Sequence, residues 1–401
     1  MRRFLDGWQQ PFRPQWPTWF SVSLGRFTQF VRWASLFIAT GGALAPQLAA
    51  ARDALPIERL SLPTGFYVEV LSDQVPGARG MVLGPKGTLF VGSRAQGAVY
   101  AITLDPSRAY AAKVRTVASG LNMPVGVAMR NGALYISAVS RIIKLDDIEN
   151  RLDNPGQPSV VYDKLPGESH HGWRYIAFGP DQRLYIGVGA PCNVCKRDEN
   201  RYAMISSMKP DGTDWRVVAR GVRNTVGFDW QPGTNTLWFT DNGRDLLGDD
   251  VPDDELNRLT RTGEHFGFPY CHAGNVADPE FGREKRCSAF TPPMAKLGAH
   301  VAALGMKFYT GKQFPEDYRG SIFIAEHGSW NRSRKVGYRV VRVVLDTKGN
   351  VAKQEVFAQG WLGDDESVWG RPVDLLTLPD GSLLISDDHA GAIYRITYRK
   401  P

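Results

Sequence analysis

Short apolar runs alternate with polar residues along most of the chain, and each run follows a cluster of turn residues. Proline presets the first position of a turn, and glycine, aspartate or asparagine suit the positions after it. The runs are rich in aromatic and β-branched side chains, which favour strands. Six copies of this turn-and-strand unit occur, at residues 84–92, 130–137, 179–187, 231–240, 318–325 and 378–386.

The repeat predicts the fold class. A hairpin of this kind cannot bury its faces alone, whereas radially stacked sheets can. We therefore expect an all-β chain that forms one six-bladed β-propeller over residues 52–401. A β-sandwich with coincidental turns is the alternative, and six copies in order argue against it. Residues 57–70 are expected to supply the closing strand, and the long gap between 240 and 318 is expected to hold the largest insertion.

The first 51 residues differ in composition from the rest. They carry five arginines and one acidic residue, then an apolar run at 34–45 and three alanines at 49–51. This pattern predicts a secretory signal peptide over 1–51, and hence a periplasmic or secreted protein. An uncleaved N-terminal anchor is the alternative. The apolar run is short and interrupted by glycines, so no stable membrane span is expected.

Net charge argues against a nucleic-acid partner. The chain carries +7, and the leader accounts for more than half of that excess, which leaves the body near +3. Its basic residues are scattered rather than gathered in a stripe, as a nucleic-acid footprint would require.

The four cysteines fall into two pairs, Cys192/Cys195 and Cys271/Cys287. An even count in an exported chain favours two disulfides. The Cys192–Cys195 spacing also suits a redox-active pair or part of a metal site. Attachment of a c-type haem is excluded at this motif because Lys196, not histidine, follows the second cysteine.

Two polar motifs stand just before predicted strands. His170 and His171 precede a strand expected at 173–178, and a neutral imidazole there can act as a general base near neutral pH. Arg223 and Asn224 combine a planar cationic fork with an amide that both donates and accepts hydrogen bonds. Purely structural histidines, and an arginine that braces a neighbouring blade, are the alternatives.

Three further motifs follow later strands. An acidic stretch at 241–255 offers the hard oxygen ligands that calcium prefers, although it could equally be a solvated loop. A polar cluster occupies 327–332, and Arg371 precedes the sixth repeat. Arg371, His171 and Arg223 stand at the same phase of their repeats, which predicts a site at one mouth of the propeller channel.

Together these motifs resemble the soluble glucose/sorbosone dehydrogenase family, in its sorbosone-dehydrogenase-like, aldose sugar dehydrogenase branch. These enzymes are six-bladed propellers that use pyrroloquinoline quinone and calcium. The resemblance covers about residues 57–398. It rests on the motifs at 171–181, 189–195, 221–224, 241–255, 327–332 and 370–373.

The resemblance implies a role for each matched residue. His171 is the expected base, which takes a hydroxyl proton from a sugar or related alcohol while hydride passes to the quinone. A periplasmic partner would then accept the electrons. Where the family has a quinone-contacting lysine, this chain offers Arg332 or Lys335. The expected cofactor-binding residues are Arg223, Asn224, His327, Arg332 and Arg371, and the expected calcium-binding residues are Gly243, Arg244, Asp254 and Glu255.

Two other functions fit the same architecture. One is a calcium-dependent, sugar-lactonase-like hydrolase, and the other is a binding propeller without catalysis. The arginines at 223, 332 and 371 favour an anionic cofactor over a neutral lactone.

Overall fold

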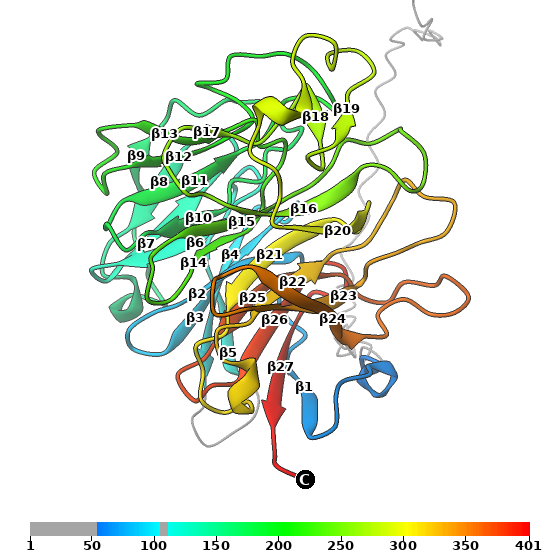
Figure 1. Cartoon of the computed structure of the whole chain (residues 1–401). Coiled ribbons are helices and arrows are strands. Elements are labelled where there is room, and N and C mark those ends of the chain that lie inside the picture. Colours follow the sequence, from blue (N-terminus) through cyan, green and yellow to red (C-terminus); the bar gives the residue numbers. More distant parts are fainter. Residues whose placement is uncertain (1–53, 105–110) are drawn as a thin grey trace, which may run out of the picture. The chain divides into compact units, whose positions relative to one another are not determined.

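The structure, a computed structural model, describes residues 54–104 and 111–401. The predicted signal peptide at 1–51 lies outside these residues and stays a prediction. Within the described chain the regular elements are short strands and four single-turn 3₁₀ helices, and no α-helix occurs (Figure 1). This agrees with the all-β class predicted from the repeat.

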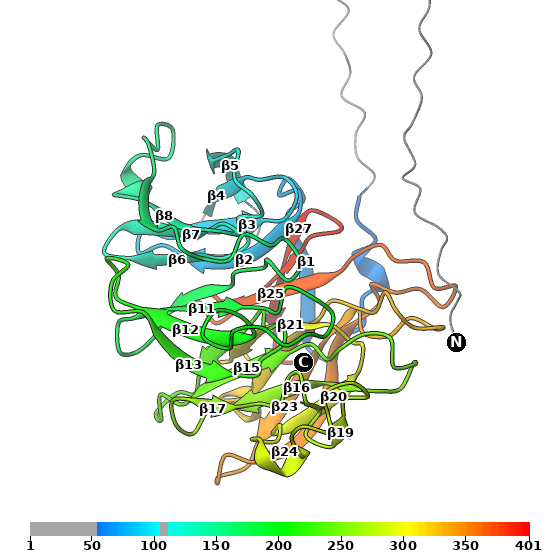
Figure 2. The ribbon, with the colours of Figure 1, turned by 90° about the horizontal axis from the view of Figure 1, so that it is seen from above.

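Six sheets of four or five strands follow one another along the chain as the blades of a β-propeller, as predicted (Figure 2). The strand of each repeated motif is the second strand of a blade. The first three blades contain β2(Ala78–Leu83), β3(Thr88–Ser93), β4(Val99–Leu104) and β5(Ala111–Ala118); β6(Val127–Arg130), β7(Ala133–Ser137), β8(Ile142–Leu145) and β9(Ser159–Tyr162); and β10(Ile176–Phe178), β11(Leu184–Val188), β12(Met204–Met208), β13(Arg216–Arg220) and β17(Glu264–His265). The last three contain β14(Phe228–Trp230), β15(Leu237–Asp241), β16(Asp253–Arg258) and β20(Ala295–Ala299); β21(Ala303–Phe308), β22(Ile322–Glu326), β23(Arg339–Leu345) and β24(Val351–Gln359); and β25(Pro372–Thr377), β26(Leu383–Asp387), β27(Ala392–Tyr398) and β1(Phe66–Ser72).

The ring is closed by the start of the described chain. Strand β1(Phe66–Ser72) pairs antiparallel with β27, so the sixth blade takes its outermost strand from the opposite end of the sequence (Figure 1). This confirms the closing strand expected in residues 57–70, although the strand extends two residues further, to Ser72.

Each blade buries both faces against its neighbours. The large apolar clusters lie between consecutive blades: 1 and 2 around Phe90, 2 and 3 around Leu184, 3 and 4 around Phe228, and 4 and 5 around Trp238. Two more fill the remaining gaps. One, around Phe323 and Tyr394, joins blades 5 and 6, and the other, around Leu89 and Leu384, joins blades 6 and 1.

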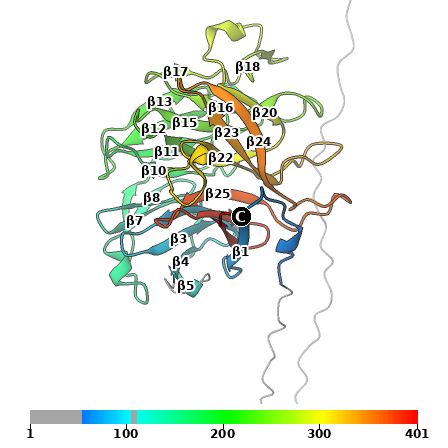
Figure 3. The same cartoon turned by 60° about the horizontal axis from the view of Figure 1, so that its bottom comes forward.

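The largest insertion lies between β16 and β20, as predicted from the gap in the repeats (Figure 3). It contributes β17 to the third blade and forms the two-stranded sheet of β18(Cys271–His272) and β19(Val276–Ala277). A disulfide joins Cys271 to Cys287 across this insertion, and a second joins Cys192 to Cys195 between β11 and β12. Both predicted pairings are confirmed.

The innermost strands carry the site. Strand β2 contacts β6 and β25, and β21 contacts β14 and β25, so the first strands of the blades face a common axis. Trp173, Val226, Leu304 and Val373, each on or just before an innermost strand, form an apolar cluster. The segments immediately before these strands therefore meet at one end of the channel.

Among the residues that the structure describes, no helix has the length and apolar character of a membrane span.

Ring closure predicts a stability effect at Phe66. Its ring packs within about 5 Å of Phe314, Phe357, Tyr318 and Tyr398, and only 8% of the residue is exposed. Phe66→Ala should lower the free energy of unfolding by about 3–5 kcal/mol, because it leaves a cavity at the closing strand. Urea denaturation measures this.

The control is the neighbouring Tyr67→Ala, since Tyr67 is 53% exposed. It should change stability by no more than about 0.5 kcal/mol. Equal losses in both variants would contradict the closing role of the Phe66 face.

Candidate active site

A cavity of about 400 Å³ opens at the channel end where the innermost strands begin. That size suits a small-molecule site. Among the residues predicted from the sequence it is lined by His171, Arg223, Asn224, Gly243, Asp254, His327 and Arg371. The equal phase of His171, Arg223 and Arg371 in their repeats thus corresponds to a shared wall of one cavity.

His171 is held in an unusual backbone conformation. Its φ of 49° lies in the left-handed region, which is uncommon for a residue with a side chain. Gly189 lies against it, and a Cβ on Gly189 would stand 2.6 Å from the Cβ of His171. The strand predicted to begin at residue 173 begins at Ile176, so His171 lies in the preceding loop.

The loop that carries His171 is fixed by a buried arginine that the sequence analysis did not single out. Arg174 donates to the backbone carbonyls of Val139, His171 and Pro166 at 3.0–3.1 Å. Burial lowers the pKa of Arg174 to about 10, so it stays charged at neutral pH. Its side chain therefore ties the loop to the neighbouring blade.

The ring of His171 has one defined hydrogen bond. Its Nδ1 lies 2.9 Å from the carbonyl oxygen of Ala190, so Nδ1–H donates and the neutral ring keeps its lone pair on Nε2. Burial, with Arg223 and then His170 nearby, holds the pKa of His171 well below its usual value. The imidazole is therefore a neutral acceptor across the physiological range. His170 packs beside it with 4.1 Å between ring centroids, but is exposed.

Four arginines line the cavity, and two of them were not predicted. Arg79 is 3% exposed, donates through Nη2 to Asp388 at 2.6 Å, and leaves Nε without a partner within the described residues. Arg94 stacks 4.7 Å from the ring centroid of Trp173. Arg79 lies on β2 and Arg94 directly follows β3, both in the first blade, where the repeat pattern gave no charged motif to mark them.

Arg371 keeps part of its fork free. Its Nε and Nη2 donate to the carbonyls of His327 and Gly328, at 3.0 and 2.6 Å. Neither Arg371 nor Arg94 forms an ion pair with any residue of 54–104 or 111–401. Two cations in one cavity that no carboxylate of the described residues pairs suit an anionic ligand.

Arg223 is placed differently. Its guanidinium donates to the carbonyls of Asn193, Asn242 and Gly243, to the side-chain oxygen of Asn193, and to Asp245. A guanidinium has five N–H donors, so each has a protein acceptor here. Arg223 contributes positive charge and fixes the carbonyls around it.

His327 and Arg79 share the buried carboxylate of Asp388. His327 Nε2 lies 2.7 Å from Asp388 Oδ1. Burial lowers the pKa of His327 to about 4, although Asp388 acts in the opposite direction. Burial alone would raise the pKa of Asp388, but Arg79 and His327 outweigh it and hold that pKa well below its usual value.

The remaining predicted cofactor residue, Arg332, does not line this cavity. It donates to the carbonyl of Asp249 and to the carboxylate of Asp250, and lies with Lys335 on a neighbouring cavity of about 670 Å³. The structure therefore places neither candidate for the family's lysine in the central cavity.

The predicted calcium ligands divide into two groups. The carboxylate of Asp254 lines the cavity and accepts from the amides of Gly243 and Ala302, both at 2.7 Å. Glu255 lies behind the wall, where it accepts from the amide of Ala273 and from Asn257, and the side chain of Arg244 binds Asp278. Burial raises the pKa of Asp254 to about 6 and that of Glu255 to about 7.

The residues at the cavity fit a calcium ion and an anionic quinone. Asn224 Oδ1 is buried and has no partner within the described residues. With the Gly243 carbonyl and Asp254 it offers the hard oxygens that calcium prefers. Arg94 and Arg371 offer cationic donors to carboxylates.

The model of the family described as TrAA12-like matches residues 60–399. The chain belongs to this TrAA12-like family. This confirms the family relationship predicted from the motifs. The protein is also 37% identical over 354 residues to an uncharacterised protein of Borreliella burgdorferi, with 85% of this chain and 91% of that protein covered.

Solved structures share the fold of this TrAA12-like protein. A calcium structure of the Trichoderma reesei carbohydrate-active enzyme of family AA12 matches with a TM-score of 0.71 and 21% identity, over 85% of this chain and 97% of the other. The holo form of the pyranose dehydrogenase PQQ domain from Coprinopsis cinerea matches with a TM-score of 0.71 and 19% identity, over 84% and 97%.

The buried Asp388 predicts a pH-dependent stability effect. Asp388→Asn should cost about 3–5 kcal/mol at neutral pH, because it leaves Arg79 without its carboxylate. Since the folded-state pKa of Asp388 is lowered, its contribution is present above the unfolded pKa of about 3.9 and is lost as pH falls below it. Denaturant unfolding at pH 7 and at several acidic pH values measures the cost of the substitution and its dependence on pH.

Asp153→Asn is the control, because Asp153 pairs with Arg115 on the surface and is 75% exposed. It should leave the free energy of unfolding nearly unchanged. A cost for Asp388→Asn that stays constant down to pH 2 would refute the ionic role of Asp388.

Proposed function

We propose that this protein is a quinone-dependent dehydrogenase that oxidises a sugar or a related alcohol, with pyrroloquinoline quinone and calcium as cofactors. The observation that carries the proposal is that one cavity holds His171, with its lone pair on Nε2, together with Arg94 and Arg371. Neither arginine forms an ion pair within the part of the chain that the structure describes. The family supports an oxidoreductase, since the neighbouring structures include a PQQ domain and a calcium structure.

The chain's own residues supply binding and proton transfer. When bound, the quinone supplies a hydride acceptor and calcium supplies a Lewis acid. Arg371 and Arg94 would hold the carboxylates of the quinone, and Asn224, Gly243 and Asp254 would hold the cation. His171 Nε2 takes the proton of the substrate hydroxyl.

The arginines set this proposal apart from a lactonase. A calcium-dependent hydrolase of a neutral lactone requires the cation and a base but gains nothing from unpaired arginines. In water-poor surroundings such cations cost free energy unless an anion binds. We also propose that the protein is exported, as the sequence at 1–51 predicts, and that it passes electrons to an acceptor outside the cytoplasm.

The proposal is tested by loading the purified apo-protein with pyrroloquinoline quinone and calcium. Aldose-dependent dye reduction should appear across at least part of a sugar panel, and a calcium chelator added before loading should suppress it. Hydrolysis of a sugar lactone in calcium alone, with no quinone-dependent dye reduction, would establish the lactonase instead.

Two arginine variants make the same test residue-specific. Arg371→Ala should weaken quinone binding by about 1.5–3 kcal/mol, the usual loss for a hydrogen bond to a charged group. Arg332→Ala is the matched control, because Arg332 faces the neighbouring cavity, and its quinone affinity should equal that of the wild type. Quenching of intrinsic fluorescence by added quinone measures both. A weaker affinity for Arg332→Ala alone would show that the anion lies elsewhere.

The base is tested by His171→Gln. Turnover of the quinone-loaded enzyme should fall by roughly 10²–10⁴, with quinone affinity nearly unchanged. Because the pKa of His171 is lowered, the wild-type rate should hold below pH 6.5 and decline only in more acidic solution. His170→Ala is the control, and it should lower turnover much less than His171→Gln does. Near-normal turnover of loaded His171→Gln would show that another group takes the proton.

A further inference from the structure

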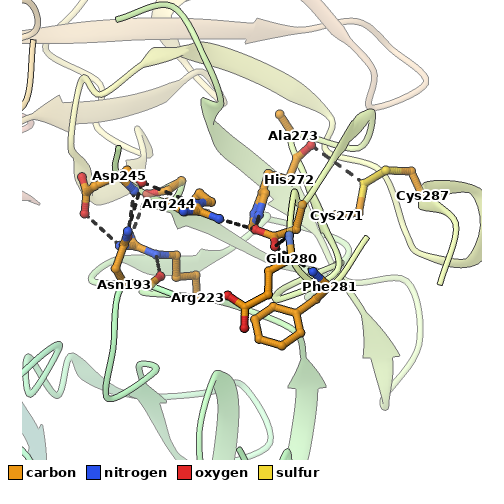
Figure 4. A network of polar contacts seen from close by, with 12 residues as sticks. Asn193, Arg223, Arg244, Asp245, Cys271, His272, Ala273, Glu280, Phe281 and Cys287 are labelled. Atoms are coloured by element: carbon orange, nitrogen blue, oxygen red, sulfur yellow. Dashed lines mark hydrogen bonds and ion pairs between the residues drawn. A yellow bond between two sulfur atoms is a disulfide. The ribbon is translucent and has the colours of Figure 1, made fainter. Parts of the chain in front are cut away.

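The loop between β11 and β12 reaches the wall of the cavity. The Cys192–Cys195 disulfide closes a ring of four residues within this loop, and Asn193 lies inside that ring. Figure 4 shows Asn193 directed toward Arg223 and Asp245. None of the roles described above belongs to Asn193 or to this disulfide.

Asn193 makes four hydrogen bonds to one ion pair. Its side-chain oxygen accepts from Arg223 Nη2 at 2.9 Å and from the Asp245 amide at 2.8 Å. Its backbone oxygen accepts from Arg223 Nε at 2.8 Å, and its Nδ2 donates to the Asp245 carbonyl at 3.0 Å. Arg223 and Asp245 themselves lie 3.0 Å apart.

Arg223, held in this way, in turn orients two backbone carbonyls of the cavity wall. With Nε and Nη2 on Asn193 and Asp245, its Nη1 is aimed at the carbonyls of Asn242 and Gly243, at 3.2 and 2.7 Å. The guanidinium is nearly inaccessible, with 4% of its side chain exposed. The orientation of the Gly243 carbonyl therefore depends on where Arg223 is held.

We propose that the disulfide-closed loop 192–195 is a clamp in which Asn193 is the positioning residue for Arg223, and through Arg223 for the carbonyls of Asn242 and Gly243. The proposal rests on the proposed function where its effect is expressed as quinone affinity. Residues that orient ligand-holding groups are typically worth about 10–100-fold in affinity or activity. The clamp acts on binding, not on proton transfer.

The clamp is redox-sensitive. Cys192 and Cys195 are both half-buried, whereas the other disulfide joins the buried Cys271 to the half-buried Cys287. A dithiol reductant supplies two electrons and two protons, becomes a disulfide itself, and converts the Cys192–Cys195 bond to two thiols. The opened ring no longer fixes Asn193 against the ion pair.

The first experiment measures backbone amide hydrogen exchange in the full-length apo-protein. In Asn193→Ala the Asp245 amide loses its acceptor, and in the Cys192→Ser/Cys195→Ser double variant that acceptor is no longer fixed. In both variants, amide exchange over residues 242–247 should accelerate at least tenfold. Asn200→Ala is the matched control. Asn200 holds Arg220 from the same loop, and its loss should leave 242–247 protected as in the wild type.

The second experiment measures the dissociation constant for pyrroloquinoline quinone in calcium, and the turnover of the fully loaded enzyme. The dissociation constant should rise about 10–100-fold in Asn193→Ala, while turnover at saturation changes far less. A dithiol reductant should weaken quinone binding by the wild type but not further in the double variant, which retains Cys271–Cys287. The wild-type measurement in this arm needs no folded variant.

The outcomes separate the clamp from the proposed function. Unchanged exchange over 242–247 in both clamp variants overturns the clamp, whether or not quinone binds. A loss of turnover at saturation with an unchanged dissociation constant overturns it as well. A wild type that binds no quinone removes the proposed function, and the exchange result then decides the clamp alone.

Discussion

The structure depends on the burial of both faces of every sheet. A four-stranded blade with two apolar faces cannot be covered from one side, and the six clusters between consecutive blades satisfy this requirement only when the ring is complete. The last blade is therefore completed by β1, from the beginning of the described chain, where Phe66 packs among aromatic rings. The ends of the propeller domain are held together by the same apolar packing that holds the blades.

The closed ring creates the site as a consequence. The segments before the innermost strands come from different blades, yet the ring brings them to one end of the channel, beside the apolar cluster around Leu304. Burial then shifts the pKa values of the ionisable groups at the site. It lowers the pKa of His171 and His327 and raises the pKa of Asp254, so the histidines are kept neutral and a cation beside the carboxylate is favoured.

The arginines at this site act in two ways. Arg371 and Arg94 form no ion pair with a carboxylate of the described residues, whereas every N–H of the Arg223 guanidinium donates to a protein acceptor. The first kind is available to the anionic ligand proposed above, and the second holds part of the cavity wall. An arginine motif in a sequence does not distinguish these uses, because the difference lies in which acceptors the fold brings within 3 Å.

The sequence by itself determined the all-β class, the six blades, the closing strand, the position of the insertion and the family, because turn chemistry and apolar alternation are local and repeat. It also marked His171, Arg371 and Asp254, which stand at fixed phases of the repeat or in an acidic run. Only the tertiary structure decided that Arg332 faces another cavity and that Arg79, Arg94 and Asp388 join the site. Their placement depends on which blades face each other across the channel and on which charged side chains are buried side by side. The spacing of residues along the sequence does not contain this information.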